Sequence, residues 1–497
     1  DMSKSMPLNT PILAVACGLW LMAASVVASD AADETGPFQA TGFKVGEIDA
    51  TSAIVWTRLT LRPQRNPSDG PDVKIDYEKT NKSVPRRDRT VKAIRFDDGV
   101  TVRDMRMAAP GADGEVRVLY QPDGDSQWRE TPWEQVDPLG DLTRQFHLRD
   151  LQPATRYLLR VESRTLQGQS GQTLEGEFRT APAADDAARV VFTVSTGQGN
   201  LDNDRPDGFN IYPEMRKLSP DFFVHTGDIL YYDDFAKTVD LARYHWQRTY
   251  SWPTNVEFHR HVGSYFIKDD HDTWRDDCWP SMKTPYMHEF TFPQGVALFL
   301  EQVPMGDRTY RTRRWGKDLQ IWMVEGRDFR SPNDAPDGPD KTIWGAEQKE
   351  WFKRTLTESD ATFRLLISPT PIVGPDRPTK ADNHANTAFA HEGNEIREFL
   401  KDHKNVFVVC GDRHWQYASV DPKTGVREYS CGPASDVHAG GWKQEDYIPE
   451  YHRFLKVIGG FLAVTVERQE GRPTIVFRHY DVNGNVTHED RFAAESP

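Results

Sequence analysis

The chain has 497 residues, of which 37% are hydrophobic and 27% are charged, and its formal net charge is −14. This length exceeds that of one ordinary domain, and the 14 Trp and 25 Phe residues exclude a disordered chain. The acidic balance argues against a nucleic acid as the partner, because proteins bind that polyanion through basic surfaces. We therefore expect a soluble globular protein with two or more domains.

The first 28 residues have the pattern of a secretory signal peptide. Lys4 precedes an uncharged apolar run from Ile12 to Ala28, which ends among small residues and is followed by acidic ones. This order predicts cleavage after about residue 28, and a secreted or periplasmic protein that has no stable membrane span after cleavage. The alternative is a membrane anchor, because the run is close to the length that spans hydrocarbon.

Residues 38–182 are predicted to form an N-terminal β-sandwich domain with a long insertion. Thr51–Thr60 alternates apolar and polar residues, and a second alternating segment begins at Tyr157. Such a period of two is typical of half-buried strands. Between these segments, residues 62–140 are rich in Pro, Gly and charge, and we expect them to form the insertion, with strands whose positions the sequence does not give. The stretch TAPAADDAA at 180–188 then has the composition of a linker.

Residues 189–497 are predicted to form a second domain in which apolar strands alternate with helices. Val190–Thr196 and Asp221–Asp228 are predicted strands, and the short segment IYPEMRKLS between them is a predicted helix. Three further apolar runs fit this pattern: Ile321–Asp328, Phe363–Thr370 and Asn405–His414. The alternation implies an α/β domain with its chemistry at the carboxyl ends of strands. From about Phe461 onward, the pattern favours antiparallel strands.

Three short motifs place carboxylates, a phenol and imidazoles after predicted strands. They are HTGDILYYDD (His225–Asp234), KDDHDTW (Lys268–Trp274) and CGDRHW (Cys410–Trp415). Carboxylates this close repel one another, so the three aspartates of KDDHDTW indicate a site for positive charge. Hard divalent or trivalent cations bind carboxylate, phenolate and imidazole ligands, and one carboxylate can bridge two such ions. We therefore predict a metal centre at one rim where the three strands end.

The motif order GDxxY, DDHD and GDxH resembles the alkaline phosphatase D (PhoD-like) family of calcineurin-type metallophosphoesterases. The resemblance extends from about Phe38 to the C-terminus, and it includes the TSAIVWTR strand and the segment Val324–Asn333. It implies a mixed α+β or α/β fold class, in which an N-terminal fibronectin-like β-sandwich precedes a metallophosphoesterase β-sandwich flanked by helices. It also implies a secreted phosphomonoesterase or phosphodiesterase that uses a water activated by two metal ions.

Roles for individual residues follow from the same resemblance. Asp228 would be the carboxylate that bridges two ions, and His271 would be the acid that protonates a leaving oxygen. The other expected metal ligands are Tyr231, Asp270, Asp412 and His414.

Three further residues are candidates from their positions near predicted strand ends or in a loop. Arg327 and Arg413 are expected to neutralise a phosphoryl oxygen, and an ion pair at the surface is the alternative for each. His384 lies in the loop Asp382–Gly393, where it either reaches the pocket or is solvated. If it reaches the pocket, His384 would contact a metal ion or the substrate.

One residue departs from the family pattern. The first motif of the family ends a strand with Ser-Cys-Gln, and its Cys binds metal, whereas this chain has Thr196 at that place. A neutral hydroxyl is a far weaker ligand than a thiolate, so the first ion either loses a ligand or recruits Gln198 or Asn200. The resemblance implies Fe³⁺ and Ca²⁺ as the ions, and the oxygen- and nitrogen-rich donor set also suits Mn²⁺ or Mg²⁺.

The expected partner is a small phosphate-ester substrate, and the sequence leaves the oligomeric state open. Two other functions are compatible with the motifs. Paired cations do not select the central atom of an ester, so hydrolysis of sulfate or other esters is one alternative. The other alternative is an anion- or polysaccharide-binding protein that has lost turnover, and the retained His271 argues against it.

Overall fold

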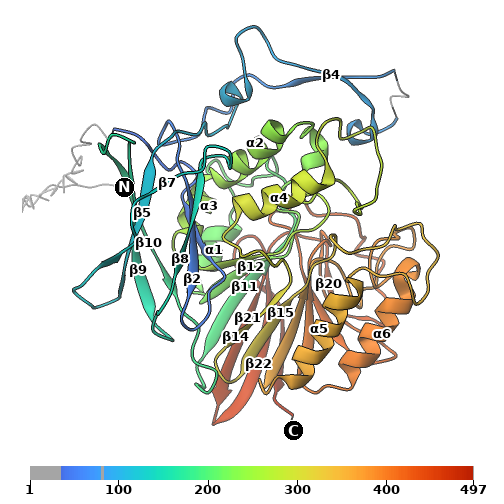
Figure 1. Ribbon diagram of the computed structural model, residues 1–497. Helices are drawn as coiled ribbons and strands as arrows, with labels where there is room; N and C mark the ends of the chain where they lie inside the picture. Colours follow the sequence, from blue (N-terminus) through green and yellow to red (C-terminus); the bar gives the residue numbers. More distant parts are fainter. Residues whose placement is uncertain (1–34, 80–82, 496–497) are drawn as a thin grey trace, which may run out of the picture. The chain divides into compact units, whose positions relative to one another are not determined.

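Strands make up more of the described chain than helices do (Figure 1). The computed structural model describes residues 35–79 and 83–495, so the predicted signal peptide lies outside the described residues. Within the described ranges, no helix is long and apolar enough to cross a membrane. The residues from Thr35 onward belong to one unit, whose parts are described together below.

The N-terminal strands form two antiparallel sheets. The first has the order β1 (Phe43–Gly46), β2 (Ala53–Arg58), β8 (Thr143–Leu148). The second has the order β10 (Ser170–Arg179), β9 (Arg156–Arg164), β5 (Glu115–Pro122), β6 (Arg129–Glu130), and β7 (Glu134–Gln135) also pairs with β5. Apolar residues at alternate positions, such as Val55 in β2 and Val118 in β5, are buried in one common core, as a period of two requires. The predicted N-terminal β-sandwich is confirmed.

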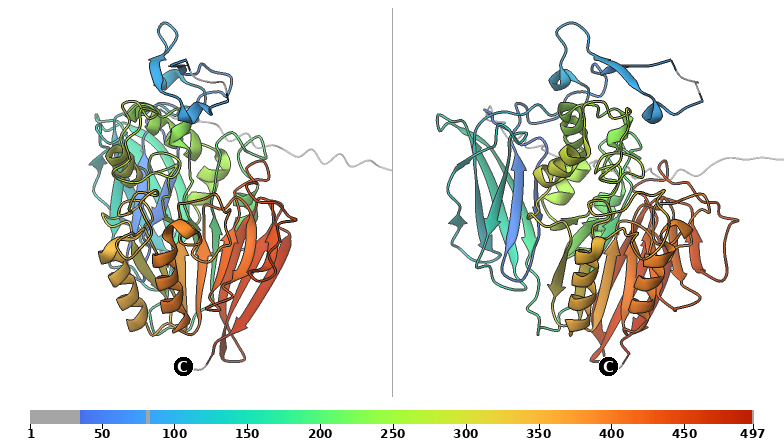
Figure 2. Two further views of the ribbon diagram at one scale, coloured as in Figure 1. Left: turned by 90° about the vertical axis from the view of Figure 1, so that its right-hand side faces the viewer. Right: turned by 45° about the vertical axis from the view of Figure 1, so that its right-hand side comes forward.

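The insertion is shorter than the sequence indicated, because β5, β6 and β7 fall within residues 62–140 and belong to the sandwich. What remains carries a two-stranded sheet and two short 3₁₀ helices: β3 (Lys74–Tyr77), η1 (Arg86–Asp88), β4 (Val91–Arg95) and η2 (Val102–Asp104). Figures 1 and 2 show this segment projecting beyond helix α2 (Val239–Tyr250). Its base packs there, since Met105 and Leu241 share a small buried cluster. The insertion therefore rests on the second half of the chain.

The residues from Val190 onward form a second sandwich of two mixed sheets. The six-stranded sheet has the order β13 (Ser264–Phe266), β12 (Phe222–His225), β11 (Val190–Ser195), β21 (Phe461–Gln469), β22 (Arg472–Tyr480), β23 (Val486–Ala493). The seven-stranded sheet has the order β14 (Arg311–Trp315), β15 (Leu319–Met323), β16 (Phe363–Ser368), β17 (Val406–Cys410), β19 (Arg427–Cys431), β18 (Gln416–Val420), β20 (His452–Lys456). The strands β11 to β13 are parallel, and so are β15, β16, β17 and β19. The C-terminal strands β21 to β23 are antiparallel, as predicted.

Alternation along these strands explains why helices cover both outer faces of the sandwich. The helices are α1 (Ile211–Lys217), α3 (Pro253–His259), α4 (Phe292–Gln302), α5 (Gly345–Glu358), α6 (Ala390–Lys401), η3 (Tyr232–Asp234) and η4 (Thr387–Phe389). In β15, Met323 lies in the core between the sheets, whereas Trp322 packs in the cluster under α5 and α6. In β12, Phe222 faces the same core, whereas Phe223 packs against α1 and α3. The predicted β-sandwich flanked by helices is confirmed.

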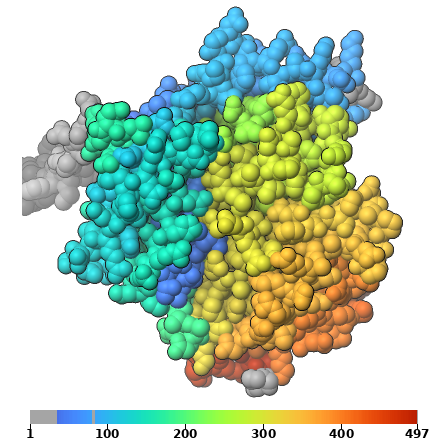
Figure 3. Space-filling model, viewed as in Figure 1, coloured from blue at the N-terminus to red at the C-terminus, as the bar shows by residue number. Residues whose placement is uncertain are grey.

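The two sandwiches contact each other through buried charged side chains. One carboxylate oxygen of Glu47 lies 2.7 Å from Nη2 of Arg311 in β14, and the other lies 2.5 Å from Nη2 of Arg313. In Figure 3, the blue and teal residues of the N-terminal part lie against the yellow residues near position 300. We propose that residues 38–182 and 189–497 are two domains that share this contact. The short connection between them contacts the second domain, since the carbonyl oxygen of Asp186 accepts the N–H of Lys317 at 2.7 Å.

Replacing Glu47 should destabilise the protein, because the side chain is 6% exposed and faces two guanidinium groups. Glu47→Gln leaves positive charge uncompensated, and loss of one partner from a buried pair costs about 3–5 kcal/mol. Asp97→Asn removes the exposed partner of Lys74 and is the control, which should leave stability nearly unchanged. Urea unfolding measures both variants, and equal midpoints would contradict a stabilising role for Glu47.

Candidate metal centre

The three motifs follow β12, β13 and β17, and the fold gathers them at one rim. Because β12 and β13 are parallel neighbours, Asp228 and Asp270 leave the same edge of one sheet. The chain turns sharply at two of the strand ends, where Asp228 has φ 54° and Asp412 has φ 62°. Residues other than glycine rarely adopt this left-handed region, and such backbone persists where the surrounding structure holds it, often at functional sites.

Five of the predicted residues form one group, which we call the Asp228 cluster: Asp228, Tyr231, Asp270, His271 and His414. Donor atoms of Asp228, Asp270 and His271 all lie within 4.8 Å of one another. Nε2 of His414 lies 3.5 Å from Oδ2 of Asp228 and 3.3 Å from the phenol oxygen of Tyr231. That phenol oxygen is 3.5 Å from Oδ2 of Asp228. Ligands of one metal ion, each about 2.0–2.6 Å from it, have separations of this size.

Buried negative charge shows that the Asp228 cluster suits a cation. Asp228 is 1% exposed, and its Oδ1 has no hydrogen-bond partner among the described residues. Burial, together with the neighbouring charge of Asp270, raises the pKa of Asp228 well above its usual range. A bound cation would remove this penalty, and carboxylate, phenolate and imidazole donors suit Fe³⁺, Mn²⁺, Mg²⁺ or Ca²⁺. The residues therefore fit the ions that the family resemblance implies.

The three aspartates of KDDHDTW have different partners. Asp269 accepts a hydrogen bond from Nε of Arg327 at 2.6 Å, and Asp272 accepts from two backbone N–H groups at 2.6 and 3.0 Å. Burial disfavours the charge of Asp270, but the positive charges of His271 and Arg327 outweigh it and lower the pKa of Asp270. Asp270 is the one aspartate of this motif that groups with Asp228.

Acidic neighbours hold His271 in its charged form. Its Nδ1 lies 2.9 Å from Oδ1 of Asp233, a residue that the motif analysis did not assign a role. Burial disfavours the charge, but Asp233 and Asp270 outweigh it and raise the pKa of His271 well above its usual range. Its Nε2 lies 3.6 Å from Oδ1 of Asp276. A raised pKa favours the protonated imidazole, which is the form that an acid for a leaving oxygen requires.

Arg327 and Arg413 differ from the expected substrate-facing cations. Both side chains are completely buried. Arg327 pairs with Asp269, and Nη1 of Arg413 lies 2.7 Å from Oδ1 of Asp376. The expected metal ligand Asp412 forms an ion pair with the adjacent Arg413. Each guanidinium therefore compensates carboxylate charge inside the protein instead of facing a substrate.

Thr196 lies beside the cluster, but its hydroxyl forms hydrogen bonds with backbone groups. Oγ1 donates to the carbonyl oxygen of Gly227 at 3.1 Å and accepts the N–H of Asp412 at 3.2 Å. This hydroxyl thus joins the turn that carries Asp228 to the turn after β17. The structure places Thr196 as a support of the rim, where the family pattern has a metal-binding Cys.

The remaining candidates have partners outside the Asp228 cluster. The side-chain oxygen of Gln198 accepts a tyrosine hydroxyl, and the side-chain oxygen of Asn200 accepts a tryptophan ring N–H at 3.1 Å. Nε2 of His384 lies 2.9 Å from Oε2 of Glu392, and the imidazole is completely buried. The fold therefore does not bring these three side chains together with the carboxylates and imidazoles of the centre.

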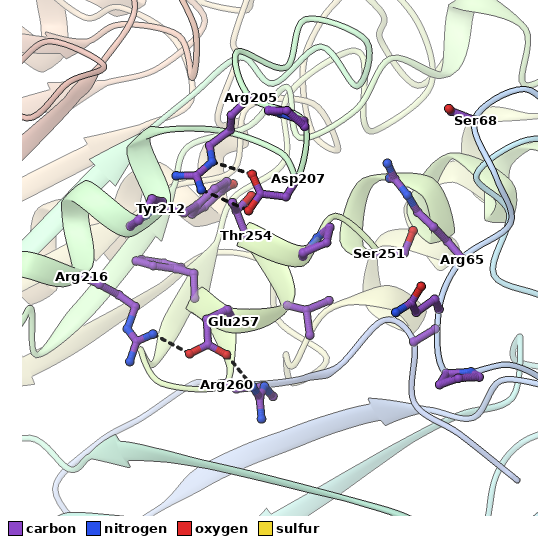
Figure 4. A pocket seen from close by; sticks show the side chains of 18 of the residues that line it. Arg65, Ser68, Arg205, Asp207, Tyr212, Arg216, Ser251, Thr254, Glu257 and Arg260 are labelled. Atoms are coloured by element: carbon purple, nitrogen blue, oxygen red, sulfur yellow. Dashed lines mark hydrogen bonds and ion pairs between the residues drawn. The ribbon is translucent and has the colours of Figure 1, made fainter. Parts of the chain in front are cut away.

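A large cavity lies away from the Asp228 cluster. Its volume is about 1030 Å³, and residues of the insertion, α1 and α3 line it. Figure 4 shows that three of its arginines have acidic partners: Arg205 pairs with Asp207 at 2.6 Å, and Arg216 and Arg260 both pair with Glu257. A fourth, Arg65, lies over the ring of Trp252. No residue of the Asp228 cluster lines this cavity, so we do not assign the phosphate site to it.

The region that contains the cluster matches a known family. Residues 192–455, which are more than half of the chain, match the family model described as PhoD-like phosphatase. The chain belongs to the PhoD-like phosphatase family. Membership of this family supports a phosphoester hydrolase.

Two solved structures share the fold of the chain. One is a structure of PhoD, with a TM-score of 0.69 and 15% sequence identity over 92% of this chain and 91% of that chain. The other is the purple acid phosphatase PPD1 from yellow lupin (Lupinus luteus) seeds, with a TM-score of 0.60 and 11% identity over 91% of this chain and 74% of that chain. Identities this low show the fold alone. A search of curated protein sequences gave no match.

The metal-free PhoD-like protein should gain stability when Asp228 loses its charge. The pKa of the Asp228 carboxyl is higher in the folded state than its value of about 4 in the unfolded state. The buried carboxyl therefore does not destabilise the protein below about pH 4, and its destabilising effect grows as pH rises through the folded-state pKa. In the presence of a chelator at pH 7, Asp228→Asn should therefore have a higher Tm than the wild type. The two Tm values should converge near pH 4.

Added Mn²⁺ should raise the Tm of the wild type and leave that of Asp228→Asn unchanged, because an ion that binds only the folded state stabilises it. Asp98→Asn, at an exposed position of the insertion, is the control and should alter neither response. A wild type that is more stable than Asp228→Asn in chelator at pH 7 would contradict an uncompensated charge at this site.

Proposed function

We propose that the chain is a secreted, metal-dependent hydrolase of small phosphoric monoesters or diesters. The observation that carries this proposal is the Asp228 cluster, which combines a buried carboxylate whose Oδ1 has no hydrogen-bond partner among the described residues, phenol and imidazole donors, and His271 held by Asp233. Membership of the PhoD-like phosphatase family supports the phosphoester. The apolar run at the N-terminus supports export.

Asp228, Tyr231, Asp270 and His414 would hold two or more metal ions, with Asp228 between them. Ions bound there would lower the pKa of a water nucleophile and neutralise charge on the phosphoryl oxygens. The chain would keep these donors at fixed separations. The packing of β12 beside β13 and the burial of Asp228 and Asp270 restrict their movement.

His271 would protonate the leaving oxygen. Its Nδ1–H points to Asp233, which fixes the ring and stabilises the imidazolium, and its Nε2–H is left for the substrate. As a bond forms between phosphorus and the oxygen of the attacking hydroxide, whose proton has passed to solvent, the bond to the ester oxygen breaks. That ester oxygen takes the Nε2 proton, which solvent then restores to His271. Asp233 therefore acts through His271 as a positioning residue.

Arg87, on the insertion, would supply the positive charge that Arg327 and Arg413 do not present to a substrate. Its Nη2 lies 3.3 Å from Oδ2 of Asp276, and Oδ1 of Asp276 lies 3.6 Å from Nε2 of His271. Its side chain is 41% exposed, whereas Arg327 and Arg413 are completely buried. An exposed guanidinium at this distance can bind a phosphoryl oxygen, since arginine donors match phosphate geometry.

Removal of the metal ions should abolish hydrolysis. Chelator-treated protein should not cleave p-nitrophenyl phosphate or bis(p-nitrophenyl) phosphate, and Mn²⁺ or Ca²⁺ should restore the rate. Asp270→Asn and His414→Ala should each lower bound metal and rate together, because each removes a donor. His391→Ala, at an exposed position of α6, is the control. Full activity of the stripped protein would end the metal proposal, and cleavage of p-nitrophenyl sulfate alone would replace the phosphate substrate with a sulfate ester.

His271→Gln should retain its metal ions and lose rate, by about 10²–10⁴-fold for alkyl phosphate esters. Nitrophenyl esters should lose less, because nitrophenolate leaves without a proton. Asp233→Asn should show a smaller loss with the same dependence on the leaving group, since it acts on the orientation and charge of His271. Steady-state rates over a series of alcohols measure this, and equal losses for alkyl and nitrophenyl esters would remove His271 from the role of the acid.

A further inference from the structure

A second histidine, outside the three motifs, reaches the phenol of the Asp228 cluster. Nε2 of His438 lies 2.6 Å from the phenol oxygen of Tyr231, closer than Nε2 of His414 at 3.3 Å. The centroids of the two imidazole rings are 4.3 Å apart. The phenol oxygen is also 3.5 Å from Oδ2 of Asp228, so two imidazole nitrogens and one carboxylate oxygen converge on it.

Asp202 fixes which nitrogen of His438 faces Tyr231. Oδ2 of Asp202 lies 2.7 Å from Nδ1 of His438. An ionised carboxylate only accepts hydrogen bonds, so Nδ1 carries the hydrogen and Nε2 presents a lone pair to the phenol. A carboxylate behind the far ring nitrogen is the arrangement that orients metal-binding histidines in proteins.

Glycines leave the room that this arrangement needs. Gly197 has φ 51°, and a Cβ there would lie 3.1 Å from the ring of His414 and 3.3 Å from the ring of His438. A Cβ at Gly199 would lie 2.2 Å from Oδ2 of Asp202. Any side chain at these positions would press on the imidazoles or on the carboxylate that holds one of them.

Backbone hydrogen bonds place the segment that carries His438 before any ligand binds. Gly440 donates its N–H to the carbonyl oxygen of His414 at 3.0 Å, and Ala434 donates to that of Gly197 at 3.0 Å. The side chain of His438 is 14% exposed. Its imidazole is therefore held over the rim at little further entropic cost.

We propose that His438, oriented by Asp202, is a metal ligand of the Asp228 cluster beside Tyr231 and His414. The family pattern places a metal-binding Cys at the position of Thr196, and the hydroxyl of Thr196 is used by the backbone. An imidazole from a different segment would then supply the donor that is missing there. The resulting oxygen and nitrogen donor set suits a wider range of ions than a set with thiolate. This inference rests on the proposed metal-dependent function.

Binding of Co²⁺ tests the role of His438, because its affinity and visible absorption both report on the ligands, independently of catalysis. His438→Ala should weaken Co²⁺ binding by at least about tenfold and change the absorption spectrum. Asp202→Asn should act in the same direction to a smaller extent, because it leaves the imidazole present without its orienting carboxylate. His391→Ala is the control and should change neither measurement.

Imidazole added to His438→Gly separates a ligand from a packing residue. Free imidazole should enter the space vacated by the side chain and restore both the affinity for Co²⁺ and the wild-type spectrum. If His438→Ala fails to fold, Asp202→Asn and the rescue of His438→Gly still give the result.

Unchanged Co²⁺ affinity and spectrum in His438→Ala would overturn the proposed ligand and leave the metal-dependent function intact. A wild-type protein that binds neither Co²⁺ nor Mn²⁺ would overturn the proposed function itself. Weakened binding in His438→Ala without any rescue by imidazole in His438→Gly would assign the residue to packing, and so would also overturn the proposal.

Discussion

Negative charge that the fold buries at one rim of the second sandwich is the constraint on which the rest of the site depends. The protein compensates most of this charge with its own cations: Arg327 pairs with Asp269, and Arg413 pairs with Asp376. Among the described residues, Asp228 pairs with no arginine or lysine, although it is as deeply buried. Its Oδ1 has no hydrogen-bond partner there, and its Oδ2 lies 3.5 Å from the phenol oxygen of Tyr231 and 3.5 Å from Nε2 of His414. A folded protein rarely keeps an unpaired carboxylate in its interior. A cation bound at Asp228 would compensate the carboxylate charge that the arginines and lysines of the protein leave unpaired.

The sheets on either side of the core are joined at this rim, which keeps the donors at fixed distances. Lys268, after β13 of the six-stranded sheet, lies 2.9 Å from Glu325 and 2.6 Å from Asp328, which follow β15 of the seven-stranded sheet. Thr196 links Gly227 to Asp412 across the same gap. Both sheets have covered faces, so their strand ends are where polar groups can meet a ligand. Rigidity of the rim and access to it thus come from the same architecture.

Much of this arrangement could be predicted from the sequence, because periodic apolar runs define strands and carboxylates after them are conspicuous. Asp228, Tyr231, Asp270, His271 and His414 follow such runs, and the fold brings all five together. A predicted strand end indicates where a side chain lies. It does not indicate which residue, elsewhere in the sequence, neutralises the charge of that side chain.

That distinction explains where sequence and structure differ. Arg413 follows a strand as expected. However, its guanidinium is buried in an ion pair with Asp376, which lies in a loop distant in the sequence. His438 and Asp202 lie outside the three motifs, and their contacts with Tyr231 and with each other follow only from the fold. The insertion was overestimated because β5 lies in a stretch whose Pro, Gly and charged residues mask its alternation.

The position of a bound ion tests the central claim most directly. Crystals grown with Mn²⁺ can be measured at a wavelength where manganese scatters anomalously. An anomalous peak within about 2.0–2.6 Å of donor atoms of Asp228 and its neighbours in the cluster is the result predicted here. A peak confined to the nearby carboxylates of Asp276 and Asp277, with none within bonding distance of Asp228, would contradict the account.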